Sequence, residues 1–283
     1  MEVMKKQADY IQRIEIKALW GRKDRSIVWN LRPDVNILSG INGIGKSTIL
    51  NKSVRWLNAQ VTGEIDGRTN DPNVRLTFAP ADANCVRYSV IRSFDRPLIN
   101  SSLMEKMVDK NVGTELDWQI YQLQRLYLDY QVNIGNRIIE LLQSGEPDAQ
   151  QRAAEVSAPK KKFQDLIDDL FSETGKKILR KSNEIAFEQV GETLYPYQLS
   201  SGEKQMLAIL LTVLVQDNQP FTLFMDEPEV SLHVEWQQRL ISLIRDLNPR
   251  TQIVLTTHSP AVIMNGWMDA VTEVSDILVP VEK

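Results

Sequence analysis

The residues with the clearest chemical meaning form a glycine-rich loop that follows a short apolar segment. From Ser39 to Thr48 the chain reads SGINGIGKST, directly after the apolar run at 35–38. Glycines let the backbone turn tightly and aim its N–H groups at phosphate oxygens, and the helix N-terminus that follows adds positive potential. The pattern predicts that this loop binds a nucleoside triphosphate. The residues expected to contact it are Gly40, Asn42, Gly43, Ile44, Gly45, Lys46, Ser47 and Thr48.

Two carboxylates, Asp226 and Glu227, follow a second apolar segment at 221–225. Ligands of open α/β sheets bind beside the carboxyl ends of the strands, so these groups are expected near the loop. Lys46 is expected to reach the β- and γ-phosphates, while Ser47 and Asp226 hold Mg²⁺, which prefers oxygen ligands. Glu227 is expected to polarise the water that attacks the γ-phosphate. The alternative interpretation is that both acids only favour the N-terminus of a following helix.

Two further segments carry small and ionisable residues. The stretch LSSGEKQ at 199–205 opens an apolar helix at 206–215, and such a helix start suits an anion or serves as an ordinary N-cap. The stretch TTHSP at 256–260 ends another apolar segment with His258. A histidine at a strand end is usually structural, but both histidines of the chain, His233 and His258, follow the predicted magnesium strand. This concentration favours a role for histidine at the same edge of the sheet.

These residues require a sheet to position them. Alternating or dense apolar residues predict strands at 14–18, 27–29, 35–38, 74–78, 86–91, 221–225 and 253–256, with a helix from 46 to about 58. The last two strands have the character of buried parallel strands. The chain is expected to be a single ATPase domain over 1–283, with a core at 1–96 and 195–283 and a helical insertion at 97–194.

The insertion is predicted to be mostly helical. A long amphipathic helix is indicated by apolar residues at three- and four-residue spacing, namely Leu116, Ile120, Leu123, Leu126, Tyr130, Ile134, Ile138 and Leu141. A second stripe from Phe163 to Phe171, with Ser157 and Pro159 near its start, predicts a second helix packed antiparallel to the first. The pair is expected to fold on the core, or else to protrude as an arm that touches a partner.

Composition narrows the class of protein. Charged residues make up 25% and apolar residues 42% of the 283 residues, and no apolar run is long enough to span a bilayer. The expected location is the cytoplasm, which agrees with a lone cysteine, Cys85. A net charge of −4 excludes a surface that is basic everywhere. The lysine-rich segments 160–162 and 176–181 are interpreted as a solvated face or as contacts to DNA phosphates.

The order of phosphate loop, LSSGE segment, Asp-Glu strand and THSP segment resembles the ATP-binding-cassette ATPase superfamily. NGIGKS at 42–47 and SGE at 201–203 resemble its RecF and structural-maintenance-of-chromosomes branch more than transporter subunits. EPEVSLH at 227–233, followed by WQ, is most similar to ATPase domains of the overcoming-lysogenization-defect nucleases and related bacterial defence ATPases. The implied fold is an α/β P-loop ATPase head with N-terminal antiparallel strands, a mainly parallel core sheet and an inserted helical subdomain.

The resemblance also implies a mechanism in which two copies close head to tail around two ATP molecules. The residues of one copy that complete the other site are then Ser200, Ser201, Gly202 and Glu203. His258 is implied to contact the γ-phosphate, beside the catalytic Lys46 and Glu227, and the segment 229–233 to run along the interface. The family usually carries a glutamine before the helical part, whereas none occurs between Gln60 and Gln119.

The candidates to replace that glutamine are Ser93 and Asp95, and the candidates to stack on adenine are Trp20, Arg22 and Arg25. The expected function is Mg²⁺-dependent ATP hydrolysis by a homodimer or larger assembly in bacterial defence against phage. Its partner is expected to be a separate effector, such as a nuclease or toxin, or DNA, and no membrane contact is expected. The alternative function is that of a nucleotide-binding subunit of a membrane transporter.

Overall fold

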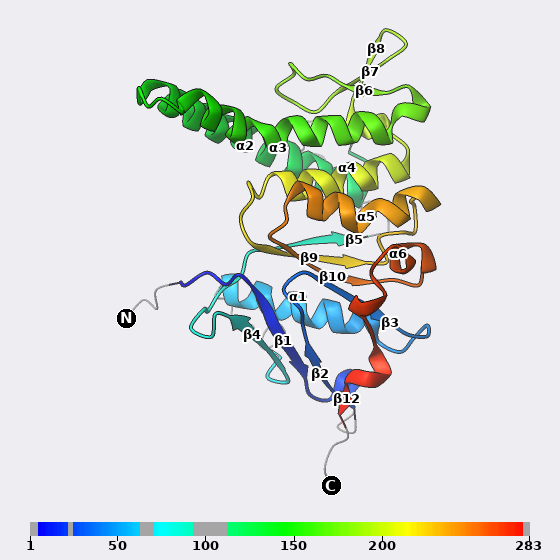
Figure 1. Cartoon of the computed structure of the whole chain (residues 1–283). Helices are drawn as coiled ribbons and strands as arrows, with labels where there is room; N and C mark the ends of the chain where they lie inside the picture. The colour runs from blue at the N-terminus through cyan, green and yellow to red at the C-terminus, as the bar shows by residue number, and fades with distance from the viewer. Residues whose placement is uncertain (1–4, 22–24, 63–70, 93–111, 280–283) are drawn as a thin grey trace.

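The computed structural model describes residues 5–21, 25–62, 71–92 and 112–279. The predictions for Arg22, Ser93 and Asp95 lie outside these ranges. Two sheets, a helix between them and a layer of helices on the far side make up the head, and a pair of long helices projects from it (Figure 1).

A parallel sheet forms the centre of the molecule, in the order β11-β3-β10-β9-β5. Its strands are β3 (Val35–Ser39), β5 (Tyr88–Arg92), β9 (Phe221–Asp226), β10 (Thr251–Thr256) and β11 (Val271–Glu273). Both faces are buried, which explains the dense apolar character of these strands. Leu223 and Met225 face the helical layer, while Phe224 between them belongs to the core on the other side. This is the parallel core sheet that the sequence predicts.

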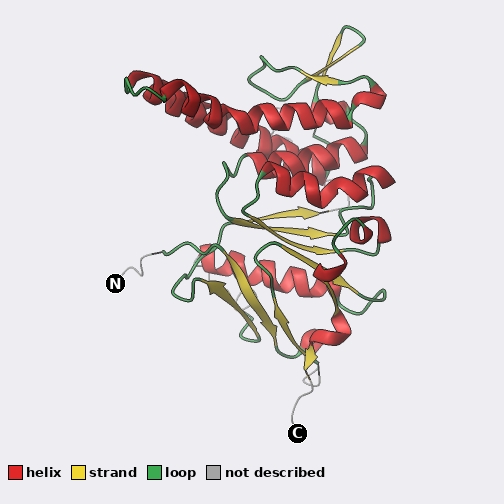
Figure 2. Ribbon diagram, viewed as in Figure 1, coloured by secondary structure: helices red, strands yellow, loops and turns green. Residues whose placement is uncertain are grey.

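An antiparallel sheet lies beside it in the order β12-β2-β1-β4, as Figure 2 shows in yellow. Its strands are β1 (Tyr10–Ile16), β2 (Ser26–Asn30), β4 (Val74–Ala79) and β12 (Leu278–Val279). Helix α1 (Lys46–Thr62) runs between the two sheets and contributes Ile49, Leu50 and Leu57 to their shared core. This packing fixes the start of α1, and therefore the phosphate loop, at the carboxyl end of β3.

Helices cover the other face of the parallel sheet. They are α2 (Glu115–Gln143), α3 (Ala149–Leu170), α4 (Ser201–Leu214) and α5 (Val234–Leu247), followed by the short α6 (Pro260–Met264). Helix α4 is buried from Glu203 to its end at Leu214, between the sheet and α2 with α3. Helices α2 and α3 lie side by side as predicted, but Leu126 is 50% exposed and Tyr127 is buried instead. The buried face otherwise follows the predicted stripe, since Leu116, Ile120, Leu123, Tyr130 and Ile134 are all buried.

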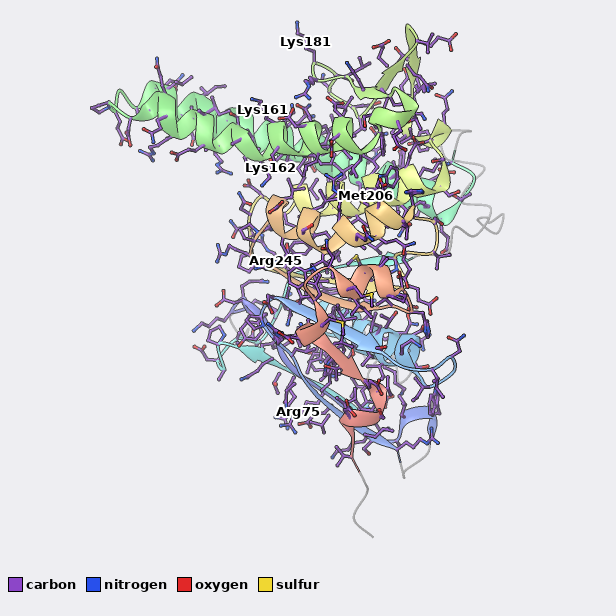
Figure 3. The ribbon with its side chains drawn as sticks, turned by 45° about the vertical axis from the view of Figure 1, so that its right-hand side comes forward. Arg75, Lys161, Lys162, Lys181, Met206 and Arg245 are labelled. Carbon is purple, nitrogen blue, oxygen red and sulfur yellow. The ribbon has the colours of Figure 1, made fainter. Side chains whose placement is uncertain are left out.

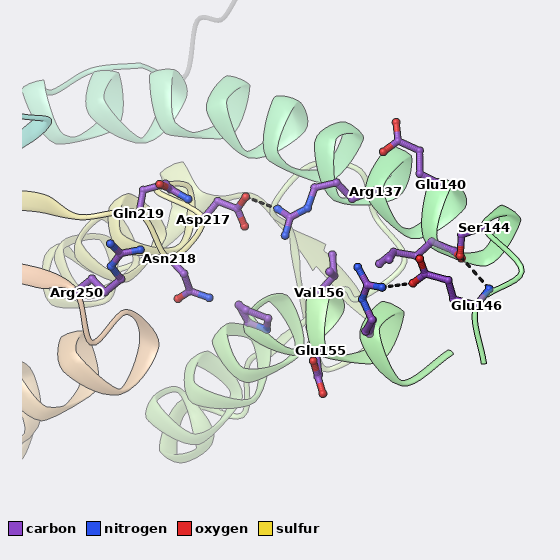
Figure 4. Close-up of a pocket in the computed structure, with 13 residues that line it drawn as sticks. Arg137, Glu140, Ser144, Glu146, Glu155, Val156, Asp217, Asn218, Gln219 and Arg250 are labelled. Atoms are coloured by element: carbon purple, nitrogen blue, oxygen red, sulfur yellow. Dashed lines mark hydrogen bonds and ion pairs between the residues drawn. The ribbon is translucent and has the colours of Figure 1, made fainter. Parts of the chain in front are cut away.

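The far ends of α2 and α3 form an arm beyond the sheet (Figure 1). Helix α3 begins at Ala149, well before the predicted start near Pro159, and includes that proline in its interior. Proline is costly there because it removes a backbone hydrogen bond. Burial of Ala149 and Ala153, at 6% and 8% exposure, offsets this cost by extending the contact with α2. Figure 4 shows the groove beneath the arm, where Arg137 of α2 pairs with Asp217 of the head.

Residues 175–194, which belong to the insertion predicted to be mostly helical, contain no helix. They form a small antiparallel sheet of β6 (Lys177–Ile178), β7 (Phe187–Gln189) and β8 (Glu192–Leu194). Left-handed backbone at Gly175, with φ 68°, turns the chain after α3. The ring of Phe187 packs against that of Phe171, with the ring centroids 5.6 Å apart, and this contact anchors the sheet to the helical layer. Short 3₁₀ helices span Leu19–Gly21, Ser172–Thr174, Pro196–Gln198, Met268–Ala270 and Val274–Ile277.

None of the helices in the described ranges is long and apolar enough to cross a membrane.

Candidate ATP site

The phosphate loop connects β3 to α1 as predicted. Asn42 and Gly43 are exposed at its tip, whereas Gly45 and Lys46 are buried. Gly45 has φ 108°, and a Cβ there would lie 2.6 Å from Cζ2 of Trp20. Only glycine fits this backbone and this close approach. The loop is therefore held against the 3₁₀ helix 19–21 of the N-terminal sheet.

Lys46 lies under the loop. Its Nζ donates to the carbonyl oxygens of Gly40, at 2.9 Å, and Ile41, at 3.2 Å. Burial lowers the pKa of Lys46, while the charges of Glu227, Asp226 and Glu229 oppose that shift. The ammonium group under the loop is suited to binding phosphate, and it offsets the charge of the three carboxylates that would otherwise repel the anion.

A hydroxyl and a carboxylate meet where α1 begins and β9 ends. Ser47 Oγ donates to Asp226 Oδ1 at 2.9 Å, and Thr256 Oγ1 of β10 donates to the same oxygen at 2.6 Å. Hydroxyl and carboxylate oxygens are the donors that Mg²⁺ accepts, and Mg²⁺ takes its remaining ligands from water and phosphate. The donor set therefore fits this ion, and Ser47 and Asp226 are the residues that would hold it.

Glu227 and His258 approach each other across the ends of β9 and β10. Nε2 of His258 lies 3.5 Å from Oε1 of Glu227, and both side chains are partly exposed. Glu227 has φ 49°, an unfavourable value for a residue with a side chain. Its N–H donates to the carbonyl and hydroxyl oxygens of Thr256, at 3.0 and 3.1 Å. This contact offsets the backbone strain and directs the carboxylate out of the sheet edge.

Glu229 positions the backbone that carries His258. Its side chain is 8% exposed, and Oε1 accepts from Thr257 Oγ1 at 2.5 Å and from the His258 N–H at 3.0 Å. The resemblance placed Glu229 at the start of an interface segment, whereas its carboxylate faces inward. The neighbouring Val230 is 54% exposed, so the segment has one buried and one exposed side.

Gln237 of α5 joins the same two segments. Its Nε2 donates to the carbonyls of Glu229, at 3.3 Å, and Leu232, at 2.9 Å, and its Oε1 accepts from Ser259 Oγ at 2.6 Å. One amide thereby fixes the segment 229–232 relative to the residue that follows His258.

Replacement of Gln237 with Met is expected to lower kcat about tenfold with little change in KM for ATP. The side chain keeps its length but loses all three hydrogen bonds, so His258 and the segment 229–232 no longer move together. Steady-state phosphate release checks this, with Gln238→Met, an exposed neighbour, as the control. Equal kcat values for the two variants would contradict the positioning role.

The predicted signature residues lie at the start of α4. Ser200 and Glu203 form a capping box in which Ser200 N and Oγ both donate to Glu203 Oε2 at 2.9 Å. Glu203 is 3% exposed, and its Oε1 accepts from Thr174 Oγ1 and pairs with Lys176 Nζ at 2.9 Å. Burial raises the pKa of Glu203, but the hydrogen bonds from Lys176, Ser200 and Thr174 outweigh this effect and hold it below its usual value. Glu203 thus supports the segment from inside, while Ser200 and Ser201 are exposed.

Gly202 contacts the segment 229–233 of its own chain. A Cβ at Gly202 would lie 2.5 Å from the carbonyl oxygen of Ser231, so only glycine allows this approach. No hydrogen bond or ion pair between described residues joins 200–203 to the phosphate loop. The structure therefore brings together the predicted residues of the loop with Asp226, Glu227 and His258, and it places Ser200, Ser201, Gly202 and Glu203 on a separate element.

One contact connects the sheet to the helical layer, and a second contact beside it joins two helices of that layer. Gln119 Nε2 of α2 donates to the Val90 carbonyl of β5 at 3.0 Å. Asp117 in the same turn pairs with Lys204 of α4 at 2.8 Å, and both side chains are nearly buried. A short path therefore runs from the strand beside Asp226 to the signature helix.

Of the adenine candidates, Trp20 and Arg25 lie together. The Arg25 guanidinium is 5.3 Å from the centre of the Trp20 ring, and Trp20 is 40% exposed beside Gly45. Their role in stacking stays a prediction.

Sequence inspection missed several of these contacts. Thr256, Thr257 and Gln237 were not assigned, and the inward direction of Glu229 was not expected. The available signal was the pair Thr256 and Thr257 immediately before His258. Hydroxyl groups at the end of a fully buried strand need hydrogen-bond partners, which predicts contacts to neighbouring polar residues. Asp117 and Lys204 gave no comparable signal, since their pairing depends on how α2 crosses α4.

The fold and the site define a P-loop ATPase of the ATP-binding-cassette type. The chain belongs to the family described as "AAA domain, putative AbiEii toxin, Type IV TA system", whose model matches residues 35–265. The head of an Smc protein, crystallised with the C-winged helix domain of ScpA, has a similar fold with a TM-score of 0.51 and 14% identity. That likeness covers 90% of this chain and 92% of the Smc head. The protein is therefore an ATPase that binds ATP.

Two curated proteins are similar over shorter segments. The Septu protein PtuA of Bacillus thuringiensis is 34% identical over 87 residues, covering 26% of this chain and 22% of PtuA. The retron Vc95 probable ATPase of Vibrio cholerae serotype O1 biovar El Tor is 26% identical over 98 residues, covering 31% and 19%. The chain thus matches about a fifth of the length of each relative.

Proposed function

We propose that this ATPase serves bacterial defence against phage, that two copies close head to tail around two Mg-ATP molecules, and that closure controls a separate effector such as a nuclease or toxin. The defence role is supported by similarity to a Septu protein and a retron ATPase. The observation that carries the closure is a set of exposed apolar side chains on the segments that carry the site. They are Ile41 at 75%, Val230 at 54%, Val234 at 52% and Met264 at 73% exposure.

Exposed apolar side chains that gather on one face favour a protein interface, and each of these four lies on a segment that carries the site. Ile41 belongs to the phosphate loop, Val230 and Val234 follow Glu227, and Met264 ends the helix after His258. Ser200 and Ser201 are exposed on the signature segment, where a phosphate on a second copy can reach them. This arrangement matches the head-to-tail dimer that the sequence resemblance implies.

In the proposed reaction, Lys46 leaves the loop carbonyls to contact the β- and γ-phosphates. Mg²⁺, held by Ser47 and Asp226, neutralises charge on those phosphates when it is bound. Glu227 accepts a proton from the attacking water, whose oxygen bonds to the γ-phosphorus as the bond to the bridging oxygen breaks. His258, 3.5 Å from Glu227, is placed to hold the γ-phosphate, and ADP and phosphate leave.

Replacement of Val230 with Asp is expected to prevent ATP-dependent dimerisation while leaving ATP binding within about twofold. A charge placed in a desolvated apolar contact is costly, and Val230 is 54% exposed whereas Glu229 beside it is buried. Mass photometry with Mg-ATP measures the dimer, and nucleotide titration measures binding. Val190→Asp, at a hairpin tip that is 94% exposed, is the control and should dimerise normally. A dimer in both variants would contradict the proposed interface.

DNA binding has weaker support. Arg180 pairs with Asp165 and Asp168, Lys176 with Glu203, and Lys160 donates to Gln131. Lys161 and Lys181 are exposed without an ion pair in the described part of the chain, and Figure 3 shows them apart, on α3 and above it. If DNA stimulates hydrolysis, alanine at these two positions should remove the stimulation and preserve basal activity.

A further inference from the structure

The hydroxyl of Ser200, which the proposed closure sets against a phosphate of the second copy, is hydrogen-bonded within its own chain. Ser200 Oγ donates to Oε2 of Glu203 at 2.9 Å, and the backbone N–H of Ser200 donates to the same oxygen at 2.9 Å. A hydroxyl has one proton, so while Glu203 accepts it only the lone pairs of Ser200 Oγ face an incoming anion. Contact with a phosphate therefore requires Ser200 Oγ to turn away from Glu203.

Glu203 is a buried acid whose two oxygens each accept two hydrogen bonds. Its side chain is 3% exposed. Oε2 accepts the two Ser200 groups, while Oε1 accepts from Thr174 Oγ1 at 3.0 Å and from Lys176 Nζ at 2.9 Å. A carboxylate has about four lone-pair positions, so this one is fully used. Lys176 is the one cation among the four donors, and it therefore compensates the charge of Glu203.

The ammonium of Lys176 decides how easily the serine hydroxyl can turn. When Ser200 Oγ leaves Oε2, the carboxylate keeps the Ser200 N–H, Thr174 and Lys176. Without the ammonium, only neutral donors would remain on a buried anion, and hydrogen bonds to a charged acceptor are about twice as strong as neutral ones. Glu203 would then hold the hydroxyl proton more firmly, and its uncompensated charge would repel the approaching phosphate.

Helix capping does not require this lysine. The capping box of α4 is complete with Ser200 and Glu203 alone. A buried ion pair is also weak evidence for a role in stability, because replacing such pairs with apolar groups of the same volume is often neutral or stabilising. An ammonium held against this carboxylate therefore favours a function beyond folding.

Lys176 comes from a different element than the serine on which it acts. It lies just before β6, directly after the left-handed turn at Gly175. Gln189 Nε2 of β7 donates to the Thr174 carbonyl at 2.7 Å and so fixes this turn from the small sheet. Within the described ranges, the Lys176 side chain forms no hydrogen bond or ion pair with the phosphate loop or with the acids that follow β9. Its effect on hydrolysis therefore passes through Glu203.

We propose that Lys176 is a positioning residue for ATP hydrolysis: by compensating Glu203, it allows Ser200 to turn its hydroxyl to the γ-phosphate bound by the second copy. Lys176 then acts on the ATP site of the partner and not on that of its own chain. The inference rests on the head-to-tail closure of the proposed function. It makes the small sheet β6–β8, which places Lys176, part of the machinery that completes the second site.

Replacement of Lys176 with Met is expected to lower kcat about tenfold, while ATP binding to the chain's own loop stays within about twofold. Met keeps the apolar stem but removes the ammonium. Phosphate release at saturating Mg-ATP measures kcat, and the ATP-dependent rise in melting temperature shows that the variant is folded and binds nucleotide. Lys176→Arg, which keeps the charge, should restore kcat. Lys177→Met, at the exposed neighbouring position, should match wild type.

A second substitution separates charge compensation from packing. Glu203→Gln removes the charge that Lys176 compensates, while its amide oxygen still accepts the Ser200 N–H. In the Glu203→Gln background, Lys176→Met should therefore change kcat by less than about twofold. An equal loss in both backgrounds would show that Lys176 acts through packing, and would overturn the proposal.

Mixing two variants tests whether Lys176 acts on the site of the second copy. Lys46→Ala does not bind ATP but presents Ser200 with its lysine in place, whereas Lys176→Met binds ATP and lacks that lysine. Their mixed dimers contain one site in which every group is intact, so an equimolar mixture should reach about a quarter of wild-type activity. Activity no higher than the sum of the two separate variants would overturn the proposal.

Ser200→Ala mixed with Lys46→Ala distinguishes this inference from the proposed function. A gain of activity in that mixture supports head-to-tail closure independently of Lys176. No gain there counts against the closure itself, and the inference is then overturned with it. A gain there together with wild-type kcat for Lys176→Met overturns the inference alone.

Discussion

Replacement of Glu227 with Gln is expected to reduce kcat by about 10²- to 10³-fold while ATP stays bound. The amide keeps the shape of the side chain and its distance from His258, but it cannot accept the proton of the attacking water. The hydrogen bond from Ser47 Oγ to Asp226 Oδ1, at 2.9 Å, is left unchanged, so the residues that would hold Mg²⁺ remain. Single-turnover phosphate release and retention of radiolabelled ATP measure the two effects separately.

A slowed reaction should also trap the closed state. We expect Glu227→Gln to shift from monomer to dimer or larger species with Mg-ATP but not with ADP, because the γ-phosphate is then retained. Glu235→Gln, an exposed acid in the first turn of α5, should behave as wild type. Purification of tagged Glu227→Gln with its neighbouring gene products then tests for an effector in the complex. Normal turnover in this variant would show that another group is the base.

Replacement of Lys46 with Ala is expected to weaken ATP binding by about 10²-fold or to abolish it. Lys46 is 5% exposed beneath the loop, and its ammonium offsets the charges of Asp226, Glu227 and Glu229. Without it, the triphosphate would approach three uncompensated carboxylates. The stabilisation that ATP gives the folded state should therefore disappear, which a thermal unfolding series with increasing ATP measures.

Lys52→Ala is the matched control, because Lys52 lies on the same helix but pairs with Asp71 at the surface. It should retain the ATP-dependent rise in melting temperature. In a phage-sensitive host that carries the neighbouring genes, wild type and Lys52→Ala should lower plaque numbers, and Lys46→Ala should not. Protection by Lys46→Ala would separate defence from ATP binding and contradict the proposed function.

Local patterns were sufficient to predict the central sheet. The segments at 221–225 and 253–256 are apolar on both faces, which only a strand between two layers allows. Strand β3, the phosphate loop and α1 follow the predicted order because glycine positions and a strand-loop-helix pattern are short-range features. The fold of the ATPase head was therefore predictable from spacing and residue type.

The insertion was predicted less well. Residues 177–194 contain few helix-breaking residues. They nevertheless form strands, because Ile178 and Phe187 pair across β6 and β7 and Phe187 packs against Phe171. Pro159 indicates a helix start locally, yet burial of Ala149 and Ala153 extends α3 before it. In both places tertiary contacts outweigh the local preference, as they often do when propensities are weak.

By itself, the sequence determined the chemistry of this protein: a phosphate-binding loop, two carboxylates after a buried strand, and a histidine after the next one. Those groups lie within a few residues of a strand end, so local structure is sufficient to predict that they lie at the same edge of the sheet. Only the tertiary structure decided which groups support them. The inward carboxylate of Glu229, the bridge by Gln237 and the pair of Asp117 with Lys204 each depend on residues far apart in the chain. Their contacts are set by how helices cross the sheet and each other, which is a property of packing rather than of any local pattern.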